Sequence, residues 1–478
     1  MPEISEPEWG KRAIDMIAIL AAIADWLRHE LLLFAAVGIA VGGLDDLAID
    51  LIFLTRRYWR RARIYSRHPR TTARTLPRSR ASGQMAIFVP AWDESAVIGA
   101  MLNRTLSAWR GESFTLFVGC YPNDAATCDI VAAFAERNAN VVLVILDHPG
   151  PTTKADCLNG LWRAMNRDEE DCARRFKAVV LHDAEDVVHP DALHIFDFLL
   201  DRFDMVQLPV LPLIDPKSRW ISGHYCDEFA ETHGKLLSVR EALGAAMPSA
   251  GVGCAFRRAR VAQIAALHGD RPFDPDCLTE DYELGLRIGE LAGRGIFVRM
   301  RDAAGNLVCT REYFPSRLYD AVRQKARWTV GIALAGWDRI GWSGNIFERW
   351  MRLRDRRAPL AALVLTAAYA GGLLYAFALL LRLAGLGPAP VVDPILFGLL
   401  SINGVLLLWR LAFRCACVTH HYGWREGLRA LPRSFIANMI AIMAARRAVA
   451  IYFRIWRGAA PHWEKTQHRF PTDLESPT

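Results

Sequence analysis

The hydrophobic pattern divides the chain into long apolar stretches towards its two ends and short apolar runs in between. Residues 358–381 contain no charge, and at ~1.5 Å per residue this stretch can cross a ~30 Å hydrocarbon core. Residues 31–54 and 391–413 predict two further membrane spans. Residues 435–453 carry two arginines in the middle and therefore predict an amphipathic helix at the membrane surface, with a fourth span as the alternative.

Charged residues in and beside these stretches give an expected orientation. Arginine-rich runs at 56–61 and 352–357 are typical of the cytoplasmic ends of spans, so we expect the amino terminus to lie outside. Asp45, Asp46 and Asp50 interrupt the first predicted span. Carboxylates are costly in hydrocarbon unless they face protein or the interface, and we expect these three to lie near the inner headgroups.

Between the predicted spans, residues 85–300 alternate short β-rich runs with helical patterns. Helical patterns occupy 95–109 and 128–137, among others. This alternation predicts an α/β domain with a mostly parallel sheet covered by helices on both faces. Ligands bind such sheets beyond the carboxyl ends of the strands, so the polar residues there are the candidate site. The predicted strands are 85–90, 114–119, 141–146, 178–181 and 205–210.

Composition agrees with one soluble domain joined to membrane helices, because 52% of the 478 residues are hydrophobic. The net charge of +7 comes largely from the arginine runs beside apolar stretches and not from a separate basic domain, so nucleic acid is not an expected partner. The ten cysteines form no CxxC pair. We therefore expect neither a disulfide framework nor a zinc site.

Carboxylates follow three of the predicted strands. Glu94 with Trp92 follows the first, and Asp124 follows the second; each alone predicts a turn or helix cap more readily than a ligand contact. Asp183, Glu185 and Asp186 follow the fourth strand. Three crowded carboxylates repel one another unless a cation neutralises them, and oxygen ligands suit magnesium or manganese. We therefore predict a Mg²⁺ or Mn²⁺ site that would bridge diphosphate oxygens.

Two later motifs complete the candidate chemistry. Thr279-Glu280-Asp281 precedes a helical pattern over 282–291; a capping box is one explanation, and a general base at Asp281 is the stronger one. Gln324, Arg327 and Trp328 lie on an amphipathic stretch. Arginine and glutamine can hold phosphate and polar groups, and an indole can stack on a sugar, although tryptophan is also common as an interface anchor.

In this order the motifs resemble the family-2 glycosyltransferases of the cellulose and hyaluronan synthase type, which carry three aspartate motifs followed by QxxRW. That resemblance covers residues 85–335. A closer resemblance, over nearly the whole chain, is to the bacterial inner-membrane glycosyltransferases of the phage adsorption protein B type. It is carried by residues 43–46, 89–94, 121–124, 149–159, 182–187, 248–253 and 463–466.

The resemblance implies a cytoplasmic GT-A-like domain and a role for each motif. One departure is that the synthases usually show DxD where this chain has Asp183-Ala184-Glu185-Asp186, so the second metal ligand stays open. The implied roles are nucleotide contact for Trp92, Glu94 and Asp124; diphosphate contact for Lys154; metal binding for Asp183 with Glu185 or Asp186; catalysis for Asp281 within Thr279-Glu280-Asp281; closure over donor and acceptor for Gln324, Arg327 and Trp328; and an acceptor channel along 250–256, including Gly253.

The resulting expectation is a multi-pass enzyme of the bacterial inner membrane that transfers a sugar, an N-acetylhexosamine by preference, from a UDP-sugar to a growing cell-surface glycan. A single base without a second, nucleophilic carboxylate predicts inversion. Alternatives are a single addition onto a lipid carrier and a non-catalytic scaffold that only binds the nucleotide sugar. A glycan or lipid-linked acceptor, membrane lipid, and a homo-oligomeric or envelope export partner are the expected contacts. Expected domain bounds are 1–55, 56–84, 85–310, 311–357, 358–413 and 414–478.

Overall fold

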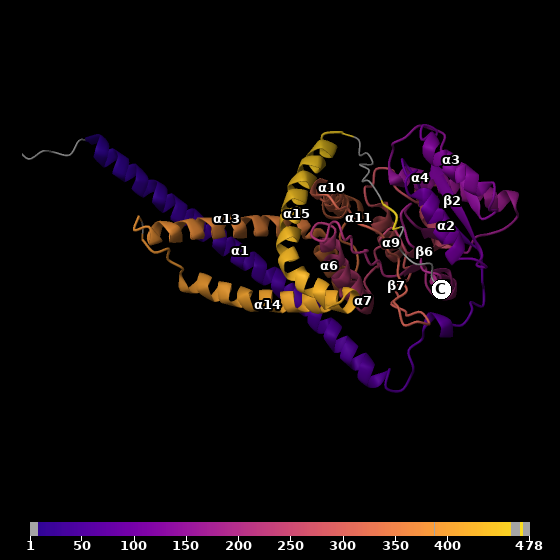
Figure 1. Cartoon of the computed structure of the whole chain (residues 1–478), viewed down its shortest axis with the longest axis horizontal. Coiled ribbons are helices and arrows are strands. Elements are labelled where there is room, and N and C mark those ends of the chain that lie inside the picture. Colours follow the sequence, from indigo (N-terminus) through magenta and orange to yellow (C-terminus); the bar gives the residue numbers. More distant parts are fainter. Residues whose placement is uncertain (1–7, 387, 460–468, 472–478) are drawn as a thin grey trace, which may run out of the picture. The chain divides into compact units, whose positions relative to one another are not determined.

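A computed structural model describes residues 8–386, 388–459 and 469–471 (Figure 1). The chain divides into two compact units. The first holds the described residues up to Asp50 together with Pro359–Phe413, and the second holds Leu51–Ala358 and the described residues from Arg414 onwards. Residues 463–466, which contribute to the resemblance noted above, lie outside the described residues.

The second unit is built on a seven-stranded sheet with the order β3-β2-β1-β4-β6-β5-β7. Neighbouring strands are parallel except around β6, which runs antiparallel to both β4 and β5. The predicted mostly parallel sheet is therefore confirmed. The strands are β1 (Met85–Pro90), β2 (Phe114–Cys120), β3 (Val141–Ile145), β4 (Ala178–Leu181), β5 (Met205–Gln207), β6 (Cys254–Arg257) and β7 (Gly295–Phe297).

Helices cover both faces of this sheet, as the sequence predicts. Alternate residues of β1 point to opposite faces: Ile87 packs with one core cluster and Phe88 with the other. The first cluster is closed by α2 (Ile98–Ala108), α3 (Ala125–Ala135) and α5 (Ala192–Leu199). The second is closed by α4 (Lys154–Asp171), α8 (Arg258–Leu267) and α9 (Glu280–Glu290).

Two strands, β6 and β7, have no counterpart among the predicted elements. They contain four and three residues, too few to show a two-residue alternation in the sequence. β6 also overlaps residues 250–256, which the resemblance assigned to an acceptor channel. Both strands form because their neighbours in the sheet supply the pairing, which is tertiary information.

Strand order fixes where a ligand can enter. From β1 the chain proceeds to β2 and β3 on one side, and it then places β4 on the other side of β1. The loops that leave β1 and β4 therefore diverge, which opens a crevice at their carboxyl ends. The predicted metal acids directly follow β4, so they lie at this switch point.

Further helices of the second unit pack beside the sheet domain. Ile440, Ala444 and Ala448 of the last long helix, α15, are buried against α10 and its neighbours. This packing favours the predicted surface helix, although α15 is also long and apolar enough to span a membrane. These elements are the 3₁₀ helix Ala73–Thr75, α6 (Gly223–Glu231), the π-helix η2 (Thr232–Leu236), α7 (Leu237–Ala242), α10 (Leu318–Trp328), the π-helix η3 (Thr329–Leu334), α11 (Ala335–Ile340), α12 (Ile346–Arg356) and α15 (Trp424–Trp456).

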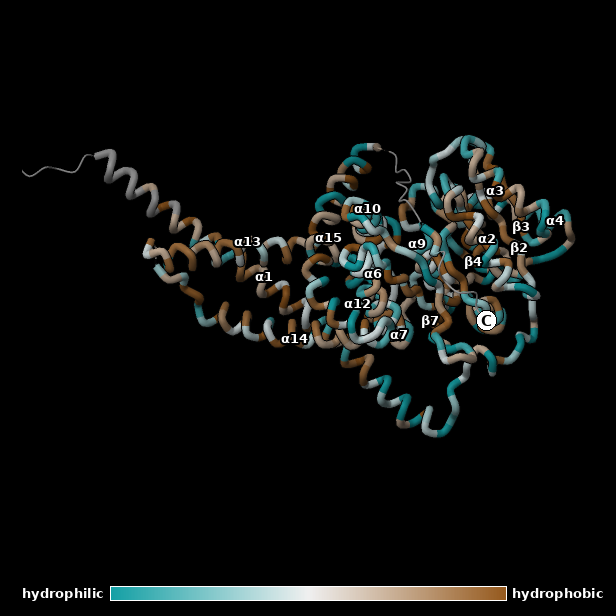
Figure 2. The backbone as a smooth tube through the Cα atoms, in the orientation of Figure 1, coloured by the Kyte–Doolittle hydropathy of each residue, from teal (hydrophilic) through white to brown (hydrophobic). Residues whose placement is uncertain are grey.

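Three long helices run through the first unit: α1 (Glu8–Arg63), α13 (Ala358–Leu383) and α14 (Pro394–Tyr422). With α15 they are the four described helices that are long and apolar enough to cross a membrane, and Figure 2 shows their hydrophobic residues. The predicted spans 31–54, 358–381 and 391–413 agree with α1, α13 and α14. The first helix is much longer than predicted, because no proline interrupts it between Glu8 and Arg63.

Aspartates of α1 face protein within the first unit. Asp50 is fully buried, and its carboxylate accepts a hydrogen bond from the indole N–H of Trp409 at 2.9 Å. Asp46 forms an ion pair with Arg410 at 3.8 Å. Arg410, which lies within the predicted span 391–413, thus compensates a carboxylate of the first span, which is how polar groups are tolerated between membrane helices.

Candidate active site

The tips of β1 and β2 are joined through Asp124. One carboxylate oxygen of Asp124 accepts a hydrogen bond from the backbone N–H of Thr127 at 3.3 Å and so caps α3. The other accepts from the backbone N–H of Asp93 at 2.6 Å. Asp124 is therefore a helix cap that also fixes the loop after β1, as the simpler explanation of this carboxylate predicts. Its contact with a nucleotide stays a prediction.

Aromatic rings line the same corner. The rings of Trp92 and Tyr121 meet edge to face with centroids 5.2 Å apart. Gly150 lies directly against both rings: a Cβ there would come within 2.8 Å of Tyr121 and 2.9 Å of Trp92. Glu94 is buried beside this corner, and its backbone N–H donates to the hydroxyl of Thr127 at 3.1 Å. At the ends of these two parallel strands the half-buried Trp92 is therefore supported by the buried side chains of Tyr121 and Glu94.

Lys154 connects this region to the tip of β4. It begins α4 directly after the cap residue Thr153, and its ammonium pairs with the carboxylate of Asp183 at 2.5 Å. Burial opposes a charge on Lys154, but the carboxylates of Asp183, Glu280 and Asp281 raise the pKa of Lys154 above its ordinary value. Lys154 therefore stays cationic among three acids.

The three acids after β4 have unequal environments. Asp183 is half-buried. Asp186 is fully buried, and one oxygen accepts from the backbone N–H of Asp183 at 3.1 Å and lies 2.6 Å from Nδ1 of His182. Burial, with the charges of Asp183 and Glu185, raises the pKa of Asp186. Burial lowers the pKa of His182 to about 4. Asp186 thus supports the loop that presents Asp183.

This arrangement bears on which acids could hold the predicted metal ion. Among the residues that the structure describes, no three acidic, histidine or cysteine side chains gather so that they could hold a metal ion. Asp183 with Glu185 or Asp186 as metal ligands stays a prediction; in the structure Asp186 is hydrogen-bonded to His182, and Glu185 is buried. A magnesium or manganese ion commonly takes only one or two protein carboxylates, with substrate phosphates as further ligands, and Asp183 fits that pattern.

The segment Thr279-Glu280-Asp281 begins α9, but the alternative of a capping box is wrong. The Thr279 side chain makes no capping hydrogen bond, and its hydroxyl is buried without a hydrogen-bond partner among the described residues. It lies instead against Gly331 of η3, where a Cβ would come within 2.4 Å of the Thr279 hydroxyl. The motif is thus positioned by the helix that follows QxxRW.

Asp281 is held against the backbone of the 248–253 loop. Gly251 has φ +77°, and a Cβ at this position would come within 2.3 Å of an oxygen of Asp281. Burial raises the pKa of Asp281, while Lys154 partly offsets this effect. Burial and the charge of Asp281 raise the pKa of Glu280 to about 7. Asp281 is therefore a carboxylate whose pKa burial raises and the charge of Lys154 lowers.

The QxxRW residues lie on α10. Arg327 acts electrostatically on both Glu280 and Asp281, which places it at the same cluster. Gln324 Oε1 and Arg327 Nε are buried without a hydrogen-bond partner in the described part of the chain. The indole of Trp328 packs edge to face against Tyr225 and Phe314, with centroids 6.1 and 6.4 Å away. Trp328 is therefore partly an anchor for α10.

One supporting residue, Gln207, was not predicted from the sequence. Its side chain is fully buried at the end of β5, donates to the carbonyl of Val252 and accepts from the N–H of Ala250, both at 2.9 Å. Gly253 in the same loop has φ +59° and packs closely on the hydroxyl of Thr310. The signal was a lone polar residue within the apolar run 205–210. Gln207 fixes the loop on which Asp281 rests.

Together the structure brings five predicted residues into one electrostatic cluster and places the others around it. The cluster contains Lys154, Asp183, Glu280, Asp281 and Arg327. Trp92, Glu94 and Asp124 lie at the neighbouring ends of β1 and β2, whereas Glu185 and Asp186 are buried behind Asp183. Three carboxylates beside two cations form a site that can accept a proton and that, with a divalent cation, can bind a polyanion.

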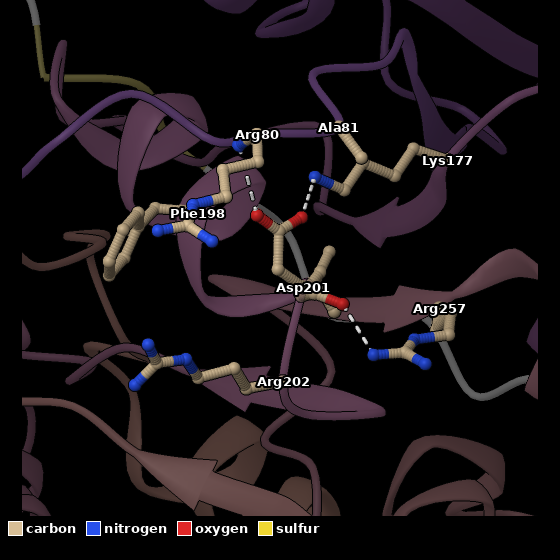
Figure 3. A pocket seen from close by; sticks show the side chains of 8 residues that line it. Arg80, Ala81, Lys177, Phe198, Asp201, Arg202 and Arg257 are labelled. Carbon is tan, nitrogen blue, oxygen red and sulfur yellow. Dashed lines mark hydrogen bonds and ion pairs between the residues drawn. The ribbon is translucent and has the colours of Figure 1, made fainter.

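A separate hollow of about 520 Å³ lies at the other end of β4 (Figure 3). Lys177, which precedes β4, and the backbone N–H of Arg80 both donate to Asp201, at 2.7 and 3.2 Å. Arg257 donates to the carbonyl of Leu200 at 2.6 Å. These charges largely satisfy one another, and β4 separates them from Asp183, so the hollow is not part of the candidate active site.

Comparison with known proteins gives one family. Residues 82–331, more than half of the chain, match the family described as glycosyltransferase like family 2. Bacteriophage adsorption protein B of Escherichia coli strain K12 and bacteriophage N4 adsorption protein B of Escherichia coli O157:H7 are each 36% identical over 95% of this chain. The chain spans 64% of the length of these relatives.

Among solved structures, the chain resembles the mannosyltransferase PcManGT from Pyrobaculum calidifontis, whose structure was determined in complex with GDP-Man and Mn²⁺. The match covers 87% of this chain and 99% of that one, with a TM-score of 0.52 and 16% sequence identity. At this identity the match supports the GT-A-like fold alone. With the family match over residues 82–331, the chain belongs to the glycosyltransferase-like family 2.

Proposed function

We propose that this chain is a membrane-associated, inverting glycosyltransferase that transfers a sugar from a nucleotide diphosphate donor to a growing cell-surface glycan. The observation that supports it most is the cluster of Lys154, Asp183, Asp281 and Arg327 at the switch point of the sheet, in a chain of glycosyltransferase family 2. A UDP-N-acetylhexosamine is the first donor to test. GDP-sugars come next, since the structure of PcManGT contains GDP-Man.

The donor would lie across the ends of β1, β2 and β4. The half-buried ring of Trp92, which packs edge to face on the buried Tyr121, would offer an apolar surface to a base, and Asp124 holds the loop after β1 in place. Lys154 and Arg327 supply the positive charge that a diphosphate needs. Asp183 would hold Mg²⁺ or Mn²⁺, which would neutralise the charge that develops on the leaving diphosphate.

Asp281 would take the proton of the acceptor hydroxyl. A general base works best when its pKa approaches the working pH, and burial moves the pKa of Asp281 in that direction. Gly251 keeps the carboxylate in one position against the 248–253 loop. With Asp183 paired to Lys154 and Glu280 buried, Asp281 acts as a base and not as a nucleophile, and direct displacement inverts the anomeric centre.

The apolar helices would anchor the enzyme in a bacterial inner membrane with the second unit in the cytoplasm. The arginine runs at 56–61 and 352–357 favour this orientation. The QxxRW motif favours repeated addition, while the small membrane portion favours a single addition onto a lipid carrier. The size distribution of the product separates these two modes.

The decisive test is nucleotide release by the purified, detergent-solubilised chain across UDP- and GDP-sugars with Mg²⁺ or Mn²⁺. Asp281→Asn should lower turnover with the productive donor by about 10²- to 10⁴-fold. Asp276→Asn is a matched control, because Asp276 is an exposed acid in the same loop before α9. A wild-type chain that binds donors without turnover would favour the scaffold, and a retained anomeric configuration in the product would exclude inversion.

A further inference from the structure

Among the described residues of the same unit, a second charged cluster contains cations and histidines but no acid. Arg299, two residues after β7, donates from its guanidinium to the carbonyl of Gly234 in η2. The same guanidinium lies 3.4 Å from Nε2 of His421, whose ring centroid is 4.9 Å from that of His420. Arg299 Nε is buried and has no hydrogen-bond partner among the described residues.

Two further arginines act on this cluster. Burial lowers the pKa of Arg299, and the positive charges of Arg57 and Arg301 lower it further. Within the described part of the chain, none of Arg57, Arg299 and Arg301 forms an ion pair with a carboxylate. Positive charges that lie together without a counterion repel one another. An anion that binds among them therefore stabilises the folded unit.

The chain segments that carry these residues continue from predicted membrane spans. Arg57 lies three residues beyond residue 54 on α1, and His420 lies seven residues beyond residue 413 on α14. At ~1.5 Å per residue they are about 5 and about 10 Å past the hydrocarbon edge, which is the depth of lipid headgroups. Tyr58 and Trp59 beside Arg57 are exposed, as interfacial aromatic residues are.

We propose that Arg57, Arg299, Arg301, His420 and His421 form a binding site for the phosphate of an anionic membrane lipid. A lipid phosphate would supply the missing negative charge and accept hydrogen bonds from the guanidinium groups. The site differs from an ordinary basic run beside a span, because the half-buried Arg299 comes from the sheet domain. A bound lipid would therefore join the end of β7 to α1 and α14. The proposal rests on membrane association and is independent of transferase activity.

Thermal unfolding of the full chain in a neutral detergent tests this site. A short-chain phosphatidylglycerol should raise the Tm of the wild-type chain, and a phosphatidylcholine of equal chain length should leave it unchanged. Arg299→Gln and Arg57→Gln should each remove that rise. Arg61→Gln should keep it, because Arg61 is an exposed arginine on the same helix, as Arg57 is, but does not act on Arg299. Arg57→Gln serves as a second variant that keeps the test valid if Arg299→Gln does not fold, because Arg299 is half-buried.

A second readout separates a lipid site from a structural role. Without lipid, Arg57→Gln should leave the Tm unchanged or raise it, since the substitution removes repulsion. A lower Tm for this variant would mean that Arg57 has a structural partner and would overturn the proposal. An equal rise with phosphatidylcholine, or the same rise with inorganic phosphate alone, would also overturn it. A chain inactive with every donor sugar would still show the lipid response, so failure of the two proposals can be told apart.

Discussion

The two charged clusters of the second unit differ in how their charge is balanced. Around Asp281, three carboxylates lie with Lys154 and Arg327, and each sign stabilises the other before any ligand arrives. Around Arg299, the described residues provide only positive charge. A balanced cluster is preorganised for chemistry, whereas a cluster of one sign is complete only with its counterion. Substitutions should therefore have opposite effects in the two places.

After the loss of Asp281 itself, the largest effect is expected from Lys154→Met, which removes a cation beside Asp281. This change removes the cation that pairs with Asp183 and leaves buried carboxylates uncompensated. We expect kcat for the productive donor to fall by about 10²- to 10³-fold, because a positive charge aimed at the leaving diphosphate is lost. Steady-state nucleotide release measures the change. Full activity of the variant would show that Lys154 has only a structural role.

The pH profile of the Lys154 variants distinguishes charge from packing. Asp281 must be ionised to act as a base, so activity rises with pH through the pKa of Asp281. Lys154 holds that pKa down against the effect of burial, and its removal should shift the acidic limb of kcat to higher pH. Lys154→Arg keeps the charge and should retain the wild-type limb. An unshifted limb in Lys154→Met would mean that the cation does not act on Asp281.

A smaller effect should follow from Gly251→Ala, which moves Asp281 without altering any charge. The new Cβ would meet the Asp281 carboxylate at 2.3 Å, and φ +77° costs a non-glycine residue about 1–2 kcal/mol. Gly244→Ala is the matched control, because Gly244 has φ +69° but no atom within 4 Å of its Cβ position. We expect similar losses of Tm, with a fall in kcat of about tenfold or more for Gly251→Ala alone. Equal kcat values would contradict the placement of Asp281.

These clusters also show what the sequence can predict. β1 and β4 agree with their predicted bounds, because each is a short apolar run that polar residues end abruptly. The end of a predicted strand placed Asp183 at this sheet edge, whereas Asp281 was assigned from its place before a helical pattern and from the family resemblance. The pairing of Lys154 with Asp183 and the buried role of Asp186 depend on side-chain distances that no local pattern encodes.

The Arg299 cluster had no sequence signal at all. Its members come from α1, from the segment after β7 and from the end of α14, and each is an ordinary basic residue in its own segment. β6 was missed for a related reason, because its pairing with β4 and β5 comes from segments far along the chain. In both cases the structure depends on which distant segments come into contact. A hydropathy pattern describes only residues that are neighbours in sequence, so it cannot predict such contacts.

The smallest expected effect is the response of Tm to salt. It tests directly whether the charges around Arg299 are unbalanced, in contrast to those around Asp281. Raising ionic strength from about 0.01 M to about 1 M shortens the Debye length from ~30 Å to ~3 Å and screens exposed charges. In neutral detergent without lipid this should relieve repulsion around Arg299 by about 0.5 kcal/mol, or about 1–2 °C in Tm. Arg57→Gln should lose that salt-dependent gain while Arg61→Gln keeps it. An equal salt response in both variants would show that Arg57 adds no repulsion, and the Arg299 cluster would then be as balanced as the one around Asp281.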